Sequence, residues 1–159
     1  MSKAPSSPEI ERKFLVDPNA LPFDLHTLNG AKIEQGYLAV NKNSSTEVRV
    51  RRRDGAATLT VKKGKGRVRD EGEINLTQSQ WETLWPFTTG WRVEKIRYDI
   101  KIGNLTAELD IYAGKHEGLS VVEVEFSNDR NAAEFGPPDW FGDEVTEEPA
   151  YKNQQLAEN

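Results

Sequence analysis

The sequence predicts an α+β fold in which eight antiparallel strands close into a β-barrel, a tunnel with a charged interior that a few helices flank. Three observations carry this prediction. Apolar and charged residues alternate with a period of two in most of the eight segments expected to be strands, as they do along half-buried strands. Short turns rich in Gly, Asn and Asp join most consecutive segments, which favours antiparallel pairing. The charged face recurs on strand after strand, so that closing the sheet would line a tunnel with charge.

The composition is that of one globular domain. Charged residues make up 30 % of the 159 residues, but four Trp, four Tyr and six Phe supply the apolar bulk that a disordered chain lacks. We treat residues 1–159 as a single domain, with residues 1–7 as a flexible leader. The chain has no cysteine, which excludes disulfides, thiolate catalysis and zinc–sulfur sites. Neither a signal peptide nor a membrane-spanning run is found, so we expect a cytoplasmic protein with no membrane partner.

Five strands are expected before the first helix. A loop or short helix at 19–30 separates the first two, and the turn NKNSS separates the second from the third. Asp54-Gly55 is a strong hairpin signal after the third strand, and Gly64 and Gly66 turn the chain after the fourth. The five strands cover residues 8–16, 32–41, 46–53, 56–63 and 67–76.

The stretch TQSQWETLWPF, which Thr77 opens, is expected to form a helix. Thr77 and Gln80 have the spacing of a capping box, in which each side chain binds the other residue's main-chain N–H. Trp81, Leu84 and Trp85 recur at helical spacing and form an apolar stripe. We expect this helix to pack its tryptophans on the outer wall of the barrel.

The C-terminal half is expected to add three strands and two short helices. The strands cover residues 91–102, 105–114 and 119–127. A short helix near 129–135, a Pro-Pro loop that carries Trp140 and Phe141, and a last helix near 149–157 complete the chain.

Same-sign charges stand at alternate positions on most of the strands. An exposed sheet face explains any single pair of this kind as solvent-facing charge. The whole set is harder to explain in this way, because like charges two residues apart on a strand lie only roughly 6–7 Å from each other. The pairs are Glu9 and Glu11, Arg49 and Arg51, Glu71 and Glu73, Lys95 and Arg97, Glu108 and Asp110, and Glu123 and Glu125.

Such a face suits a polyanion bridged by divalent cations. Carboxylates without His or Cys select Mg²⁺, Mn²⁺ or Ca²⁺, and Arg and Lys bind phosphate oxygens. The stretch from Arg49 to Arg69 is basic, with nine Lys or Arg and one Asp. Binding of nucleic acid is the other interpretation of such a stretch. A nucleic-acid surface needs a basic face with few acids, however, and the interleaved carboxylates argue against that partner.

The stretch EIERK at 9–13 matches the E-x-E-x-K signature, and the chain resembles the CYTH superfamily, the triphosphate tunnel metalloenzymes. The agreement continues in order along nearly the whole chain. It covers QGYL at 35–38, VRVR at 48–51, TVK at 60–62, EGE at 71–73, EKIRY at 94–98, ELDIYAG at 108–114, VEVEF at 122–126 and EVTEEPAYKNQQLA at 144–157. The resemblance is greatest to bacterial inorganic tripolyphosphatases, and it implies an eight-stranded tunnel.

The resemblance also implies roles for individual residues. The substrate's phosphates are expected to contact basic residues on the strands, and Lys152 of the last helix at one end of the tunnel: Lys13, Arg49, Arg51, Lys62, Lys95, Arg97 and Lys152. The expected metal ligands are Glu9, Glu11, Asp110, Glu123 and Glu125. The expected catalytic residues are Lys62, Tyr37, Glu71 and Glu73.

The function that the resemblance implies is divalent-metal-dependent hydrolysis of triphosphate, foremost of inorganic tripolyphosphate to pyrophosphate and phosphate. The implied cofactor is Mg²⁺ or Mn²⁺, the partner is the small-molecule triphosphate, and a homodimer is possible. Two alternatives stay open. One is another triphosphate-processing activity on the same fold, as a class IV adenylate cyclase, a thiamine triphosphatase or a nucleoside triphosphatase. The other is a non-catalytic module that binds polyphosphate.

Overall fold

The computed structural model describes residues 9–65 and 69–158, so the expected leader at 1–7 lies outside the described residues. The chain divides into two compact units, and each is described by itself. Of the described residues, the first unit contains 9, 33–65, 69–93 and 152–158, and the second contains 10–32 and 94–151. No helix in the described part of the chain is long and apolar enough to cross a membrane.

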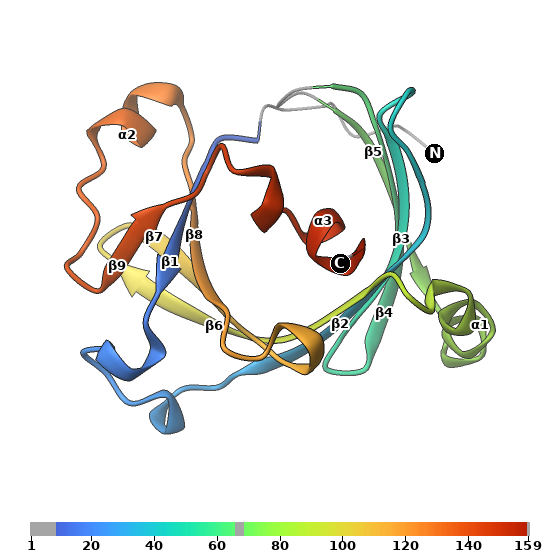
Figure 1. The fold of residues 1–159 in the computed structure, drawn as a ribbon, viewed down its shortest axis with the longest axis horizontal. Helices are drawn as coiled ribbons and strands as arrows, with labels where there is room; N and C mark the ends of the chain where they lie inside the picture. Colours follow the sequence, from blue (N-terminus) through green and yellow to red (C-terminus); the bar gives the residue numbers. More distant parts are fainter. Residues whose placement is uncertain (1–8, 66–68, 159) are drawn as a thin grey trace. The chain divides into compact units, whose positions relative to one another are not determined.

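The first unit is built on an antiparallel meander of four strands. β2 (Ala31–Asn41), β3 (Thr46–Arg53), β4 (Ala56–Lys63) and β5 (Asp70–Leu76) pair in chain order, and the first two residues of β2 belong to the second unit (Figure 1). Asp54 and Gly55 join β3 to β4 with φ angles of 48° and 89°. Two consecutive residues of positive φ are what a tight hairpin with the strands' own twist requires, so this hairpin prediction is confirmed.

The expected Trp-bearing helix is present as α1 (Gln78–Leu84), followed by the 3-10 turn η3 (Trp85–Thr88). The capping box is formed, with Thr77 Oγ1 accepting from the N–H of Gln80 and the Gln80 side chain accepting from the N–H of Thr77. Trp81 stacks on Trp85 with ring centroids 4.6 Å apart and packs against the buried Val50 and Ala57. α1 therefore covers the apolar face of the meander, as the sequence predicts. The last helix is α3 (Asn153–Glu158).

Gly36 is required where β2 passes η3. A Cβ atom at this position would lie 2.5 Å from the Cβ of Thr88, which is fully buried. No side chain fits in that space, so the glycine of QGYL lets the strand approach the turn. The position next to it, Tyr37, is thereby held against the same part of the unit, where its N–H donates to the carbonyl oxygen of Trp91.

The second unit contains five antiparallel strands. β6 (Arg92–Ile102), β7 (Leu105–Tyr112), β8 (Ser120–Glu125), β1 (Glu11–Val16) and β9 (Phe141–Glu144) pair in that order, and the first two residues of β6 belong to the first unit. The unit also contains α2 (Asp129–Glu134) and the 3-10 turns η1 (Pro18–Ala20), η2 (Leu25–Thr27), η4 (Gly114–His116) and η5 (Pro149–Tyr151).

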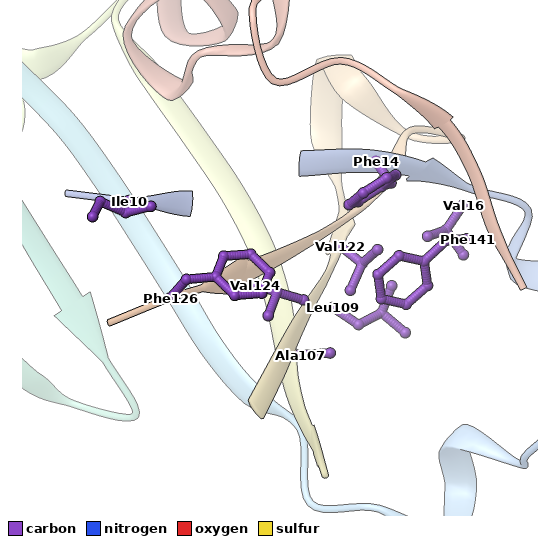
Figure 2. Close-up of a cluster of buried hydrophobic side chains, with 9 residues drawn as sticks. All are labelled: Ile10, Phe14, Val16, Ala107, Leu109, Val122, Val124, Phe126 and Phe141. Carbon is purple, nitrogen blue, oxygen red and sulfur yellow. The ribbon is translucent and has the colours of Figure 1, made fainter. Parts of the chain in front are cut away.

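The hydrophobic core of the second unit lies on one face of these strands (Figure 2). Phe14, Leu109, Val122 and Val124 are at most 2 % exposed. Side chains alternate across a strand, so the neighbours of these residues point to the opposite face. The core comprises Ile10, Phe14, Val16, Ala107, Leu109, Val122, Val124, Phe126 and Phe141.

The described strands form one mostly antiparallel sheet, but it has nine strands where eight were predicted, and it is not closed. The hydrogen-bonded order is β5-β4-β3-β2-β6-β7-β8-β1-β9, so among the described residues β5 and β9 end the sheet and do not pair with each other. The predicted eight-stranded closed barrel is wrong on both points. Alternation identifies the residues that share a face, whereas closure depends on the pairing of two distant end strands, which no local pattern encodes.

The additional strand is β9, which lies where the sequence predicted only a Pro-Pro loop. It has four residues, FGDE, with no alternation of apolar and charged positions. Gly142 makes the pairing with β1 possible, because a Cβ there would lie 2.8 Å from the carbonyl oxygen of Leu15. Phe141 is buried against Phe14, with ring centroids 5.0 Å apart. One aromatic anchor and one glycine are thus enough to add an edge strand.

Candidate active site

In the second unit, the register of four strands gathers charged residues on the face opposite the core. Glu11 pairs with Glu125 and Lys13 with Glu123 between β1 and β8. Glu123 pairs in turn with Glu108 of β7, whose neighbour on the same face, Asp110, is opposite Arg97 of β6. The face therefore interleaves acids and bases, as the alternation in the sequence predicts. From the predicted site it brings together Glu11, Lys13, Lys95, Arg97, Asp110, Glu123 and Glu125.

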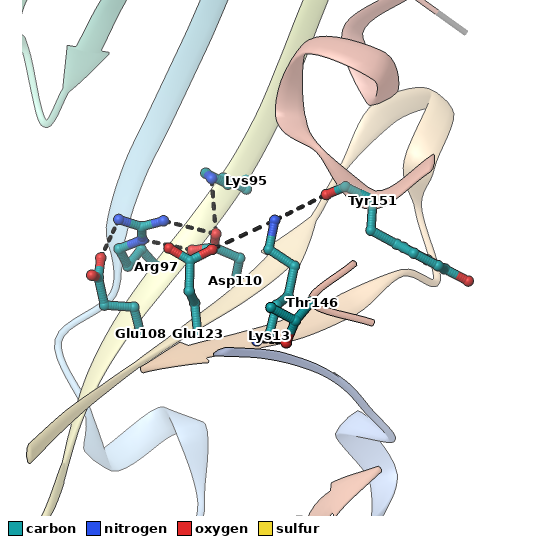
Figure 3. A network of polar contacts seen from close by, with 8 residues as sticks. All are labelled: Lys13, Lys95, Arg97, Glu108, Asp110, Glu123, Thr146 and Tyr151. Carbon is teal, nitrogen blue, oxygen red and sulfur yellow. Dashed lines mark hydrogen bonds and ion pairs between the residues drawn. The ribbon is translucent and has the colours of Figure 1, made fainter. Parts of the chain in front are cut away.

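Asp110 is the centre of this charged face (Figure 3). It is 3 % exposed and accepts hydrogen bonds from Lys95 Nζ at 2.8 Å, from Arg97 Nε at 2.7 Å and from Arg97 Nη2 at 2.9 Å. Burial opposes ionisation of this carboxyl, but the charges of Lys95 and Arg97 outweigh burial and hold its pKa below the usual range. Asp110 is therefore an anion that orients two basic side chains.

Glu108 also lies on this charged face, although it was not among the predicted site residues. Its carboxylate is half-buried and accepts a hydrogen bond from Arg97 Nη1. Burial raises the pKa of Glu108 even though the charge of Arg97 opposes the rise. The signal was present in the sequence, because Glu108 stands two positions before Asp110 and shares its face.

Lys13 and Glu123 form a second contact on this face. Lys13 Nζ lies 3.5 Å from Glu123 Oε2 and donates to the carbonyl oxygen of Tyr151 at 3.0 Å. Burial opposes ionisation of Glu123, but a hydrogen bond with Glu11 and the charge of Lys13 lower its pKa. Glu11 and Glu123 are thus two carboxyl groups in direct contact, each from a different strand.

In the first unit, a second polar face runs across β2, β3, β4 and β5. Tyr37 pairs with Arg49, Arg49 with Thr60, and Thr60 with Glu73. Lys62 pairs with Glu71 on the same face. The face brings together five predicted residues, which are Tyr37, Arg49, Lys62, Glu71 and Glu73, and Arg51 lies opposite Gln35 one step along.

Tyr37 is held by a neighbour that the sequence reading passed over. Its hydroxyl oxygen accepts a hydrogen bond from Gln35 Nε2 at 3.0 Å, and the two side chains are 2 % and 1 % exposed. Burial raises the pKa of Tyr37, while the charge of Arg49 works in the opposite direction. Tyr37 is therefore a neutral phenol at physiological pH. Gln35 has no charge, so a search for alternating charges does not detect it.

The basic residues of the first unit differ in their contacts. Within the described residues, the buried Nε of Arg49 has no hydrogen-bond partner, although buried donors are almost always paired. Lys62 Nζ lies 3.5 Å from Glu9 Oε1, and Glu73 accepts from Thr60 at 2.8 Å. Glu71 and Lys152 are exposed.

The predicted metal ligands supply the oxygen donors that Mg²⁺ and Mn²⁺ prefer, and the Glu11–Glu123 contact already joins two of them. In the described part of the chain, no three His, Asp or Glu side chains are grouped so that they could hold a metal ion. Basic side chains neutralise most of the carboxylates instead. The donor chemistry of these carboxylates therefore fits a divalent ion.

Comparison with known proteins gives consistent matches. The model of the CYTH domain family matches residues 7–148. The inorganic triphosphatase of Nitrosomonas europaea is 45 % identical over 151 residues, which is 94 % of this chain and 96 % of the relative. The inorganic triphosphatase of Acetivibrio thermocellus is 36 % identical over 152 residues, which is 95 % of this chain and 94 % of the relative.

Solved structures agree with the sequence matches. The crystal structure of the inorganic triphosphatase NE1496 superposes with a TM-score of 0.76 at 41 % identity, covering 98 % of both chains. A putative adenylate cyclase from Bacillus halodurans has a TM-score of 0.62 at 18 % identity, covering 82 % of this chain and 86 % of that one. The second likeness shows a shared fold alone.

Proposed function

The chain belongs to the CYTH domain family, and from this premise we propose that it is a divalent-metal-dependent inorganic triphosphatase, which hydrolyses tripolyphosphate to pyrophosphate and phosphate. The observation that carries the proposal is the 45 % identity to a protein named inorganic triphosphatase over nearly the full length of both chains. The cytoplasmic location and the homodimer stay predictions.

Phosphate binding is assigned to the basic residues of the two faces. Arg49 is the best-supported ligand, because a phosphate oxygen would satisfy its buried, unpaired Nε. Asp110 orients Lys95 and Arg97, so these two cations are preorganised for an anion. The remaining proposed phosphate ligands are Lys13, Arg51, Lys62 and Lys152.

Metal binding is assigned to the carboxylates Glu9, Glu11, Asp110, Glu123 and Glu125, with Mg²⁺ or Mn²⁺ as the ion. Such an ion would supply positive charge at the phosphates and activate water. Lys13 would assist its binding, because a move of Nζ from Glu123 to a phosphate oxygen would leave the Glu123 carboxylate available as a ligand.

The chemical step is in-line attack of water on a terminal phosphoryl group. The bond from that phosphorus to the bridging oxygen breaks, and pyrophosphate leaves. Glu71 and Glu73 can accept the proton of the water, while Lys62 and the neutral Tyr37 donate hydrogen bonds to phosphate oxygens as charge develops. Because its pKa is raised, Tyr37 acts as a donor and not as a base.

A substrate panel tests the proposal. Release of phosphate from tripolyphosphate, ATP and thiamine triphosphate is measured with Mg²⁺ or Mn²⁺ and again after addition of EDTA. We expect the highest kcat/KM for tripolyphosphate, no turnover with EDTA, and recovery when metal is restored. A higher kcat/KM for ATP or thiamine triphosphate would assign the chain to one of the alternative activities. Binding of tripolyphosphate without turnover of any compound would favour the non-catalytic module.

A further inference from the structure

Lys13, the signature lysine, is held at three points by the segment that follows β9. The N–H of Lys13 donates to Thr146 Oγ1 at 3.0 Å, and its carbonyl oxygen accepts from the N–H of Val145 at 2.8 Å. Its Nζ donates to the carbonyl oxygen of Tyr151 at 3.0 Å. Figure 3 shows Thr146 beside the main chain of Lys13 and Tyr151 beyond its Nζ.

The side chain of Thr146 replaces a main-chain hydrogen-bond acceptor where the regular pairing of β1 with β9 ends. The pairing of β1 with β9 is irregular between Phe14 and Val16 and ends with Phe14 opposite Glu144. Beyond that point a side-chain oxygen, Thr146 Oγ1, serves as the acceptor for the next N–H of β1 that faces β9. The main chain of Lys13 is therefore held on this side by the Thr146 hydroxyl group and by the N–H of Val145, both beyond the end of β9.

The hydroxyl group of Thr146 is itself fixed. It donates to Glu144 Oε2 at 2.6 Å, and Glu144 accepts from Arg12 Nε at 3.0 Å and Nη2 at 2.6 Å. Arg12 Nη1 also donates to the carbonyl oxygens of Ala132 and Phe135, at the end of α2. Arg12 precedes Lys13 in the chain, so the peptide that joins the two residues closes this set of contacts into a ring.

We propose that Thr146 is a positioning residue for Lys13, which sets the main chain of the signature lysine so that its Nζ reaches the triphosphate. The inference rests on the proposed function, in which Lys13 binds phosphate. To do so, Nζ has to leave Tyr151 and Glu123, and its reach is then determined by where its main chain is held. A displaced main chain weakens phosphate binding without altering the groups that carry out the chemical step.

The test compares Thr146→Val, which removes the hydroxyl and keeps the shape, with Thr146→Ser, which keeps the hydroxyl. KM and kcat for tripolyphosphate are measured in the full chain with Mn²⁺. We expect Thr146→Val to raise KM about fivefold, the value of one hydrogen bond, with a smaller change in kcat, and Thr146→Ser to stay within about twofold of the parent. Thr27→Val is the matched control, because Thr27 is an exposed residue of the same unit whose hydroxyl donates only to the carbonyl oxygen of Asp24.

A double-mutant cycle with Lys13→Gln separates positioning from general destabilisation. If Thr146 acts through Lys13, Thr146→Val should have no further effect on KM in the Lys13→Gln background. An equal effect in both backgrounds, or a parental KM in Thr146→Val, would overturn the inference. If Thr146→Val does not fold, Glu144→Gln, which weakens the anchor of Thr146, enters the same cycle with the same criteria.

The substrate panel and the double-mutant cycle test different claims, so a negative result in one can be told from a negative result in the other. Absence of tripolyphosphate turnover in the parent would refute the proposed function. Calorimetric titration with tripolyphosphate and Ca²⁺ then takes the place of KM in the cycle, so that Thr146 is judged by affinity alone. Turnover in the parent with no effect of Thr146→Val would leave the function standing and refute the role of Thr146.

Discussion

At the scale of the residue, Asp110 is the group whose loss we expect to cost the most stability. Replacing it by Asn keeps the shape but leaves Lys95 and Arg97 without their shared anion in a buried site. Removing one partner of a buried ion pair typically costs about 3–5 kcal/mol. We therefore expect Asp110→Asn to lower the free energy of unfolding by about 3 kcal/mol in urea titrations at pH 7, since Asn still accepts a hydrogen bond.

The pH dependence provides the control for this prediction. Because the pKa of Asp110 lies below its ordinary value of 3.8 in the folded protein, its contribution is complete above that value and is lost as the pH falls through the lower pKa. The stability of Asp110→Asn should therefore fall less steeply below pH 4 than that of the parent. Asp139→Asn, at an exposed position, should have the stability and pH dependence of the parent. If both variants lost the same free energy of unfolding, Asp110 would not be the anion that Lys95 and Arg97 require.

The sequence predicted which residues carry charge on each face, but not how the charges pair. Alternation places Lys95, Arg97 and Asp110 on one side of their strands, and the structure agrees. It does not indicate that Asp110 binds both cations, since that depends on the register between β6 and β7. A search for alternating charges does not detect uncharged residues such as Gln35 and Thr146, because their proposed roles depend on the hydrogen bonds that they make in the folded protein.

At the scale of the element, α1 depends on its N-terminal cap. Thr77→Ala removes the hydroxyl that accepts from the N–H of Gln80 at 3.1 Å. We expect a loss of about 1 kcal/mol in the free energy of unfolding, the usual value of an N-cap. The kcat and KM for tripolyphosphate should not change, because α1 covers the apolar face of its unit. A fall in kcat/KM of the folded variant would show that α1 contributes to the active site.

Elements with a local sequence signal were predictable, including the short helices α2 and α3, and elements without such a signal were not. The capping residues and tryptophans predict α1, and the turn residues predict the hairpin at Asp54-Gly55. β9 and the bulge in β2 between Tyr37 and Ala39 have no such signal. β9 depends on packing between segments far apart in the chain, as the close approach of Gly142 to the main chain of Leu15 illustrates.

At the scale of the whole molecule, ligand binding should raise thermal stability. The triphosphate and its divalent ion are expected to bind the folded protein and not the unfolded chain, so their binding shifts the folding equilibrium toward the folded state. A ligand at a hundredfold excess over its Kd stabilises the folded state by about 2.7 kcal/mol. Tripolyphosphate with Ca²⁺, which we expect to support little turnover, should therefore raise the Tm by several degrees.

Orthophosphate at the same concentration is the control for this prediction, since it spans fewer basic side chains and should raise the Tm far less. Equal shifts from the two anions would indicate general screening of charge and no specific site.

The measurement that tests the account most directly is the turnover of tripolyphosphate by Glu11→Gln as Mn²⁺ is increased. If the charged face holds a catalytic metal, Gln keeps the shape but removes one negative charge, and kcat/KM should fall on the order of 100-fold at low Mn²⁺ and recover in part at high Mn²⁺. The Tm of the ligand-free variant should stay close to that of the parent, because the Gln amide can donate to Glu123 in place of the Glu11 carboxyl group. Glu117→Gln, at an exposed turn, is the matched control and should behave as the parent. If Glu11→Gln and Glu117→Gln both keep the parental kcat/KM at every Mn²⁺ concentration, the charged face does not hold the metal and the account is wrong.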